Sequence, residues 1–226
     1  MSMRMKAVAP ALVCLTVASA AAAHAQSSLV CLRDVAPTVA QDMRYAGPNN
    51  FTGDPVPGYD AAECWLARPA AEALAKVQAE MEKAGKTLIV YDCYRPVRAV
   101  RHFLAWAKRQ GDKRDPAYFP RVDGSKLVEQ GYIAARSAHS TGLAVDLTFG
   151  DPNTKEPVDT GGLFDLFDYI SHTNAKVSAE ARANRNMLVG AMAKAGFTNY
   201  AAEWWHYGFK GSAPQQDVPV KACGAR

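Results

Sequence analysis

The sequence lacks the short motifs of several common enzyme and metal-binding classes. It contains no SxxK or GxSxG, so the usual serine nucleophiles are disfavoured. It has no HExxH, which excludes the common zincin scaffold. None of its 5 cysteines belongs to a CxxC pair, so a zinc knuckle is not expected. No repeat, low-complexity tract or long linker divides the chain, and we expect a single domain over residues 26–226.

A large excess of charge of one sign is also missing. The chain has 26 Lys and Arg residues against 22 Asp and Glu residues. Proteins that bind nucleic acids or anionic membranes usually carry a clear basic excess. We therefore expect no nucleic-acid partner, and the sequence does not indicate an oligomeric state.

The amino-terminal segment has the pattern of a secretory signal peptide. Arg4 and Lys6 precede a run of apolar and small residues over 7–22, and Ala-His-Ala at 23–25 offers a cleavage site. The run is too short for a membrane span and no stop-transfer segment follows it. We predict a signal peptide over residues 1–25, export to the periplasm or the medium, and no stable membrane insertion after cleavage.

Four cysteines remain after the predicted cleavage. An oxidising compartment permits disulfides, and four cysteines allow three complete pairings, among which the sequence does not decide. These residues are Cys31, Cys64, Cys93 and Cys223.

The predicted strands and helices follow one another in an irregular order, which favours an α+β fold, a small sheet with helices packed on it. Pro96 is suited to the first turn of a helix and biases Arg95 before it toward extended geometry. Between the second helix and the next strand we expect a polar excursion over 111–132 with a short helix. The predicted helices cover 66–83, 97–109 and 178–195, and the predicted strands cover 87–91, 143–149 and 203–209.

The stretch SAHSTGLAVD, residues 137–146, places a histidine and an aspartate beside an apolar strand. A buried carboxylate is costly unless it is paired or bound to a metal, so Asp146 needs a partner. Residues seven apart on a regular strand face opposite sides. We therefore expect His139 to lie in a loop, Gly142 to turn the chain, and Asp146 to lie on the strand that follows.

A second pair, Glu203 and His206, occurs in the aromatic stretch EWWHYGF. Residues three apart diverge on a flat strand, so we expect a bend, a bulge, or a strand that begins at Glu203 or Trp204. Two imidazoles, one carboxylate and a water form a common catalytic zinc site. The second carboxylate can then act as general base toward that water.

Arg95 is the natural electrophile for such a site. A guanidinium aimed at the oxyanion of a tetrahedral intermediate stabilises charge where it develops, and losing such a donor typically costs ~3 kcal/mol of barrier. Asp92, three residues earlier, can orient Arg95 through a bidentate pair.

These residues lie in motifs that closely resemble those of the zinc-dependent D-alanyl-D-alanine dipeptidases, the VanX-like metallopeptidases. The similarity extends from about Asp42 to Phe209. One departure is Cys93, which stands where this family usually has a small residue such as glycine. The matching motifs are Arg44-Tyr-Ala46 with Asn50-Phe-Thr-Gly53, Asp92-Cys-Tyr-Arg-Pro96, Gly131-Tyr-Ile-Ala134, Ser137-x-His-Ser-x-Gly-x-x-x-Asp146, Phe164-Asp-x-Phe-Asp168 and Glu203-Trp-Trp-His206.

The resemblance implies a role for each site residue. It also implies a compact α+β zinc-peptidase fold with a mostly antiparallel sheet, shared with D,D-carboxypeptidases and the hedgehog signalling domain. It implies one zinc per chain, water activation by Glu203, and stabilisation of the transition state by Arg95. It also implies that an acidic and polar pocket holds the free amino terminus of a small D,D-dipeptide. Asp168 lies close to Asp165 in the sequence and could be the acid of this pocket in its place. The implied zinc ligands are His139, Asp146 and His206, and the implied substrate contacts are Asp165, Ser137 and Tyr45.

Two other functions remain open from the sequence. A D,D-carboxypeptidase or endopeptidase would act on peptidoglycan stem peptides, and a metal-stabilised binding module would not catalyse at all. The presence of Glu203 and Arg95 disfavours the binding module, which needs neither. An exported dipeptidase would serve cell-wall turnover or scavenging, and the preference for D over L residues depends on pocket shape.

Overall fold

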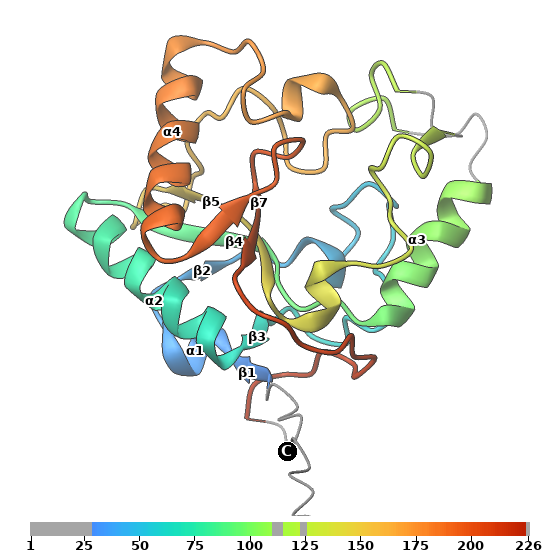
Figure 1. Ribbon diagram of the computed structural model, residues 1–226, viewed down its shortest axis with the longest axis horizontal. Coiled ribbons are helices and arrows are strands. Elements are labelled where there is room, and N and C mark those ends of the chain that lie inside the picture. The colour runs from blue at the N-terminus through green and yellow to red at the C-terminus, as the bar shows by residue number, and fades with distance from the viewer. Residues whose placement is uncertain (1–28, 110–114, 123–125, 225–226) are drawn as a thin grey trace, which may run out of the picture.

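A computed structural model of the chain describes residues 29–109, 115–122 and 126–224. Its centre is a five-stranded sheet with the order β2-β4-β5-β7-β6 (Figure 1). β2 runs parallel to β4, and the other neighbouring strands are antiparallel, as predicted for the α+β class. The predicted signal peptide lies outside the described residues. The strands are Ala40–Gln41 (β2), Thr87–Asp92 (β4), Ala144–Gly150 (β5), Phe197–Asn199 (β6) and His206–Phe209 (β7).

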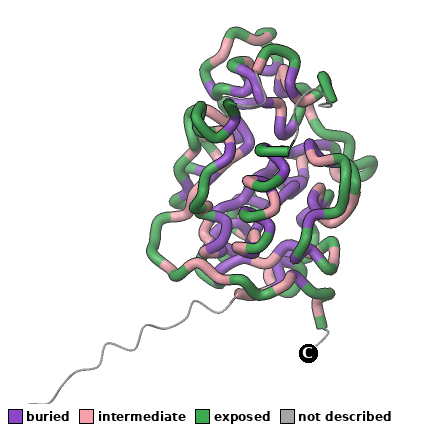
Figure 2. Tube along the Cα trace, turned by 90° about the vertical axis from the view of Figure 1, so that its right-hand side faces the viewer, coloured by how far each residue is buried: buried purple, intermediate pink, exposed green. Residues whose placement is uncertain are grey.

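The two central strands, β4 and β5, are buried along their whole length. Figure 2 shows the buried residues gathered in the interior, whereas the exposed ones follow the outer loops and helix surfaces. Strands covered on both faces read as continuous apolar runs, which is why both were recognisable from the sequence. Asp92 and Asp146 interrupt these runs and are buried polar residues of the sheet.

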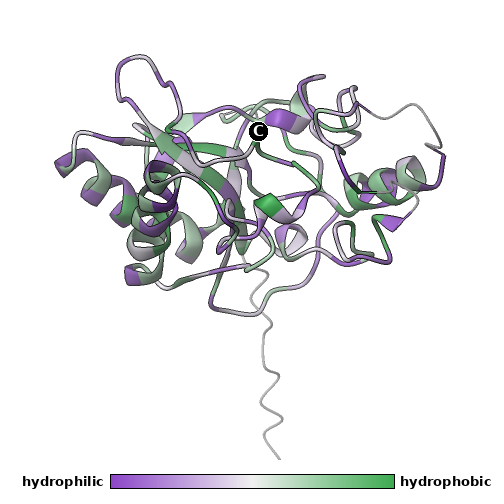
Figure 3. Cartoon of the chain, turned by 90° about the horizontal axis from the view of Figure 1, so that it is seen from above, coloured by the Kyte–Doolittle hydropathy of each residue, from purple (hydrophilic) through white to green (hydrophobic). Residues whose placement is uncertain are grey.

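Helices lie on both sides of this sheet. Arg68–Lys83 (α2) and Ala179–Lys194 (α4) pack together on one side, and Val97–Arg109 (α3) lies beyond the other (Figure 3). The short helix Leu32–Val35 (α1) contacts α2. α3 begins directly after Pro96, as predicted. No helix in the described part of the chain is both long and apolar enough to cross a membrane.

Two predicted boundaries differ from the structure by two or more residues. The helix predicted from residue 66 begins at Arg68, because Trp65–Ala67 (β3) instead pairs with Leu29–Cys31 (β1) in a separate two-stranded sheet. The last strand begins at His206 instead of Glu203, and the chain turns just before it, which is the bend expected as one alternative for this stretch. Within 111–132 the described residues form turns and bends, with 3-10 geometry at Lys126. Residues 111–114 and 123–125 lie outside the described part of the chain, so the short helix expected there stays a prediction.

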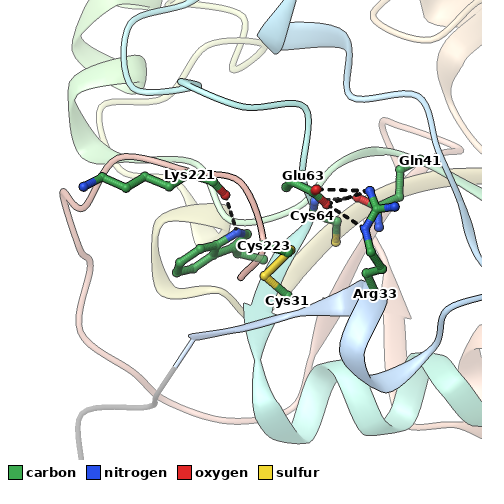
Figure 4. The surroundings of a disulfide bond; sticks show 8 residues. Cys31, Arg33, Gln41, Glu63, Cys64, Lys221 and Cys223 are labelled. Atoms are coloured by element: carbon green, nitrogen blue, oxygen red, sulfur yellow. Dashed lines mark hydrogen bonds and ion pairs between the residues drawn. A yellow bond between two sulfur atoms is a disulfide. The ribbon is translucent and has the colours of Figure 1, made fainter. Parts of the chain in front are cut away.

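All four cysteines of the described chain form disulfides. Cys31 is bonded to Cys223, which ties β1 to the carboxyl-terminal segment (Figure 4). The Trp65 indole N–H donates to the Lys221 carbonyl at 3.1 Å beside this bond. Cys64 is bonded to Cys93, so the cysteine in the position usually held by a small residue is half of a disulfide.

The Cys31–Cys223 bond should contribute strongly to stability, because it joins residues separated by 192 positions. Closing a long loop restricts the unfolded chain, and removing such a bond typically costs about 2–5 kcal/mol. Urea unfolding of the Cys31→Ser/Cys223→Ser variant should show this loss in the free energy of unfolding. An unchanged midpoint and slope would contradict the expectation.

Candidate active site

Strand register brings two of the site residues together. In the antiparallel β5–β7 pair, Asp146 lies directly opposite His206. In the β4–β5 pair, Asp92 is opposite Asp146, after a register shift between Val90 and Asp92. Three neighbouring strands therefore place Asp92, Asp146 and His206 in one row across the sheet.

His139 reaches the same place from a short 3-10 helix, Ala138–Thr141 (η3), and not from the strand. Gly142 follows with φ +74°, a left-handed conformation that glycine adopts without steric cost. A side chain there would also clash, since a Cβ atom would lie 2.9 Å from the Ala67 backbone nitrogen. The structure thus has the chain break at Gly142 that the spacing predicted.

A hydrogen bond on the side of the ring away from the site fixes the orientation of His139. Its Nδ1–H donates to the Cys93 carbonyl at 2.6 Å, so the neutral ring presents the bare Nε2 to the site. A backbone carbonyl that accepts from the second ring nitrogen is typical of metal-binding histidines. No sequence signal could have revealed this contact, because any residue at position 93 supplies a carbonyl.

His139, Asp146 and His206 bring three donor atoms to one point. Asp146 Oδ1 lies 2.9 Å from His206 Nδ1 and 3.2 Å from His139 Nε2, and the two ring nitrogens are 3.0 Å apart. Ligand atoms around a tetrahedral zinc with bonds of ~2.0–2.1 Å are about 3.3 Å apart. The donor set and its spacing therefore fit a zinc ion, and these residues could hold a metal.

The charge of this group is consistent with binding a cation. Burial alone would raise the pKa of Asp146, but the adjacent imidazoles of His139 and His206 hold that pKa well below its usual range. Asp146 and His139 are each only 2% exposed. An ionised carboxylate is thus held in the protein interior beside two nitrogen ligands.

Glu203 lies next to the three donor atoms of His139, Asp146 and His206, on the lining of the same cavity. It lies in a turn, where its N–H donates to the Tyr200 carbonyl and its own carbonyl accepts from the His206 N–H. This turn is the bend expected between Glu203 and His206, and both side chains line the same cavity. Glu203 Oε2 is 3.9 Å from His206 Nδ1. Burial raises the pKa of Glu203 to about 7, which suits a proton acceptor.

Arg95 is held by the buried Asp92 carboxylate. Its Nε–H and Nη2–H both donate to Asp92 Oδ2, at 3.0 and 2.8 Å, so the two bonds share one oxygen and do not form the predicted two-oxygen pair. The other oxygen, Oδ1, accepts from the Tyr59 hydroxyl at 2.7 Å. Sequence reasoning missed Tyr59, which lies in a loop rich in glycine and proline. Arg95 Nη2 is also 3.7 Å from Asp146 Oδ2.

Asp165 is a buried acid that has one hydroxyl donor. The Tyr45 hydroxyl lies 3.1 and 2.9 Å from its two oxygens, and in the described part of the chain Asp165 forms no salt bridge. Burial, together with the negative charge of Asp146, raises the pKa of Asp165 well above its usual range. Asp168 does not compete for this role, because it is buried in an ion pair with Arg121.

Ser137 caps the helix that carries His139. Its Oγ accepts from the His139 backbone N–H at 3.3 Å, and its carbonyl accepts from Gln215 at 3.0 Å. The side chain is half-buried and faces the same cavity as the donor atoms.

Most of these groups line one cavity of about 240 Å³. It is smaller than the ~300–1,000 Å³ typical of drug-sized ligand sites, so it suits a small substrate. Its walls include Phe103 of α3 and Trp205, together with Arg136 near Ser137, a residue that sequence analysis did not single out. The predicted site residues on its lining are Tyr45, Arg95, Ser137, His139, Asp146, Asp165, Glu203 and His206.

Comparison with known proteins identifies a family model and several relatives that share one description, D-Ala-D-Ala dipeptidase. The M15 peptidase family model, described as D-Ala-D-Ala dipeptidase, matches residues 25–222. A D-alanyl-D-alanine dipeptidase of Streptomyces coelicolor is 43% identical over 75% of this chain and 85% of its own length. Proteins with the same name from Enterococcus faecalis and Enterococcus faecium are 39% and 37% identical, covering 75% and 78% of this chain and 85% and 88% of their own.

Proposed function

This chain belongs to the D-Ala-D-Ala dipeptidase family of zinc metallopeptidases, and we propose that it hydrolyses the free D-Ala-D-Ala dipeptide to D-alanine. The observation that carries the proposal is Asp165, a buried acid that forms no salt bridge among the described residues, in the same small cavity as the three donor atoms. Burial raises the pKa of this acid and so disfavours its ionised form, which needs a cation beside it. The ammonium group of a free dipeptide supplies it, whereas the amide of a longer peptide does not.

We further propose that His139, Asp146 and His206 bind one zinc ion per chain. A bound zinc ion supplies Lewis-acid polarisation of the scissile carbonyl and a lowered pKa for the attacking water. Glu203 accepts the proton of that water and delivers it to the leaving nitrogen. The Arg95 guanidinium, fixed by Asp92, lines the cavity and faces the developing oxyanion. Asp165 with Tyr45 holds the ammonium group, and Ser137 contacts the substrate beside them.

A panel of substrates tests the proposal. Zinc-loaded enzyme should release D-alanine from D-Ala-D-Ala, and should act far more slowly on N-acetyl-D-Ala-D-Ala and on a peptidoglycan stem peptide ending in D-Ala-D-Ala. Including the L,D and L,L dipeptides measures the stereochemical preference. Zinc-loaded enzyme that is inert on D-Ala-D-Ala but cleaves the stem peptide would overturn the proposal in favour of a D,D-carboxypeptidase or endopeptidase.

Replacing Asp165 with asparagine should remove the preference for a free amino group. Truncating one partner of a buried charge pair typically costs about 2–5 kcal/mol, which is about 30- to 5,000-fold in kcat/KM. The control is N-acetyl-D-Ala-D-Ala, whose turnover by Asp165→Asn should stay near the wild-type rate. If dipeptide turnover were unchanged while stem peptides were cleaved, Asp165 would not be the ammonium contact.

We also propose that the protein is exported and acts on dipeptides released during cell-wall turnover or available for scavenging. The signal-peptide pattern over 1–25 supports this, as do the two disulfides, since such bonds persist in oxidising compartments. Fractionation of expressing cells would test the location, because a full-length cytoplasmic protein with free thiols would contradict it.

A further inference from the structure

Arg185 of α4 is a buried cation that forms no salt bridge with a carboxylate in the described part of the chain. It is 1% exposed, and its three nitrogens donate to backbone carbonyls. The bonds are Nε to Thr160 at 2.7 Å, Nη1 to His172 at 2.7 Å and Nη2 to Ile170 at 3.0 Å. Burial lowers the pKa of Arg185 to about 10, so the group is still charged at neutral pH. A buried charge is costly, so this arrangement calls for a role.

The three carbonyls lie at the two ends of the segment that carries Asp165, residues 160–172. Asp165 itself has φ +59°, a left-handed conformation that few non-glycine residues adopt. Such backbone persists only where its surroundings hold it in place. Arg185 binds both ends of the segment and thereby fixes the loop on which the Asp165 carboxylate is presented.

The same guanidinium contacts the turn that carries Glu203. Its central carbon is 5.9 Å from the centroid of the Trp204 ring. The backbone N–H of Trp204 donates to the Ser171 carbonyl at 2.9 Å. This bond joins the Glu203 turn to the Asp165 segment, between the two residues Ile170 and His172 that Arg185 binds. One buried side chain is thus in contact with the segment of the ammonium pocket and with the turn of the general base.

We propose that Arg185 is a positioning residue that sets the distance between Asp165 and Glu203, and so selects substrates whose free amino group lies one residue before the scissile bond. The inference rests on the proposed function, in which Asp165 binds the ammonium group. Arg185 lines no part of the cavity itself, and its effect on selectivity passes through the loop that it holds.

The test compares Arg185→Lys and Arg185→Met with the matched control Arg182→Lys. Arg182 lies one turn earlier on α4 and also donates to backbone carbonyls, those of Thr173 and Ala175, which follow the Asp165 segment. For each zinc-loaded protein, kcat/KM is measured on D-Ala-D-Ala and on N-acetyl-D-Ala-D-Ala in the same sample. The ratio of the two values does not depend on the folded fraction, so partial unfolding of a variant does not affect it.

We expect both Arg185 variants to lower this ratio by about 10- to 100-fold, as a displaced contact does, and Arg182→Lys to keep the wild-type ratio. A wild-type ratio in the Arg185 variants, with equal losses on both substrates, would make Arg185 a purely structural residue and overturn the inference. A wild-type enzyme without preference for the free dipeptide would instead overturn the proposed function, so the wild-type measurement distinguishes the two failures.

Discussion

Replacing Glu203 with glutamine should lower kcat for D-Ala-D-Ala by about 100- to 10,000-fold, the range typical for a general acid–base group. Glutamine has nearly the same shape but cannot accept the proton of the attacking water. Glu203 Oε2 lies 3.9 Å from His206 Nδ1, and Glu203 is not one of the three residues that could hold the metal. The substitution should therefore leave the metal bound while it removes the proton acceptor.

Zinc content and a second variant make this result specific. Metal analysis of Glu203→Gln should give the wild-type amount of zinc, which separates loss of the base from loss of the metal. Glu203→Asp keeps a carboxylate one methylene further away and should retain more activity than Glu203→Gln. Wild-type kcat in Glu203→Gln would show that another group accepts the proton.

Replacing Arg95 with lysine should lower kcat by about 100- to 1,000-fold with little change in KM, as expected for a donor that acts on the transition state. Lysine keeps the positive charge but lacks the planar group that donates twice to Asp92 and lines the cavity. The geometry at the oxyanion is therefore lost although the charge is not.

Alanine at position 95 is a poorer first test because it also lowers stability, but it allows a rescue experiment. Arg95→Ala leaves the fully buried Asp92 without its cation, which typically costs about 3–5 kcal/mol of stability. If that variant folds, added guanidinium ion should restore part of kcat. Arg98→Lys is the matched control, since Arg98 lies one turn further on and pairs with Asp217 at the surface. Equal losses in Arg95→Lys and Arg98→Lys would contradict a role for Arg95 at the oxyanion.

Much of the site was predictable because its residues occur in short motifs beside strong local signals. Gly142 and the apolar run after it predicted that His139 and Asp146 reach one point from a loop and a strand. Pro96 predicted the corner at Arg95. In each case local backbone preference and side-chain chemistry led to the same arrangement, which is where sequence reasoning is most reliable.

The remaining features depend on contacts between distant segments. The turn at Glu203 forms because its N–H and its carbonyl bond to Tyr200 and His206, and the aromatic stretch around it reads equally well as a strand. The pairing of Cys64 with Cys93 requires knowing that the start of β3 lies close to the end of β4. Arg185 looked like an ordinary polar residue of an alanine-rich helix, since nothing local indicates that its side chain binds three carbonyls.

Titration of metal-free protein with zinc tests the central claim most directly. Chelator-treated enzyme should release no D-alanine from D-Ala-D-Ala, and the rate should rise in proportion to added zinc until it levels off at one zinc per chain. His139→Ala, which lacks one of the three donors, should show no such rise. Full activity in the chelated protein, or metal-replete protein that does not cleave D-Ala-D-Ala, would contradict the account.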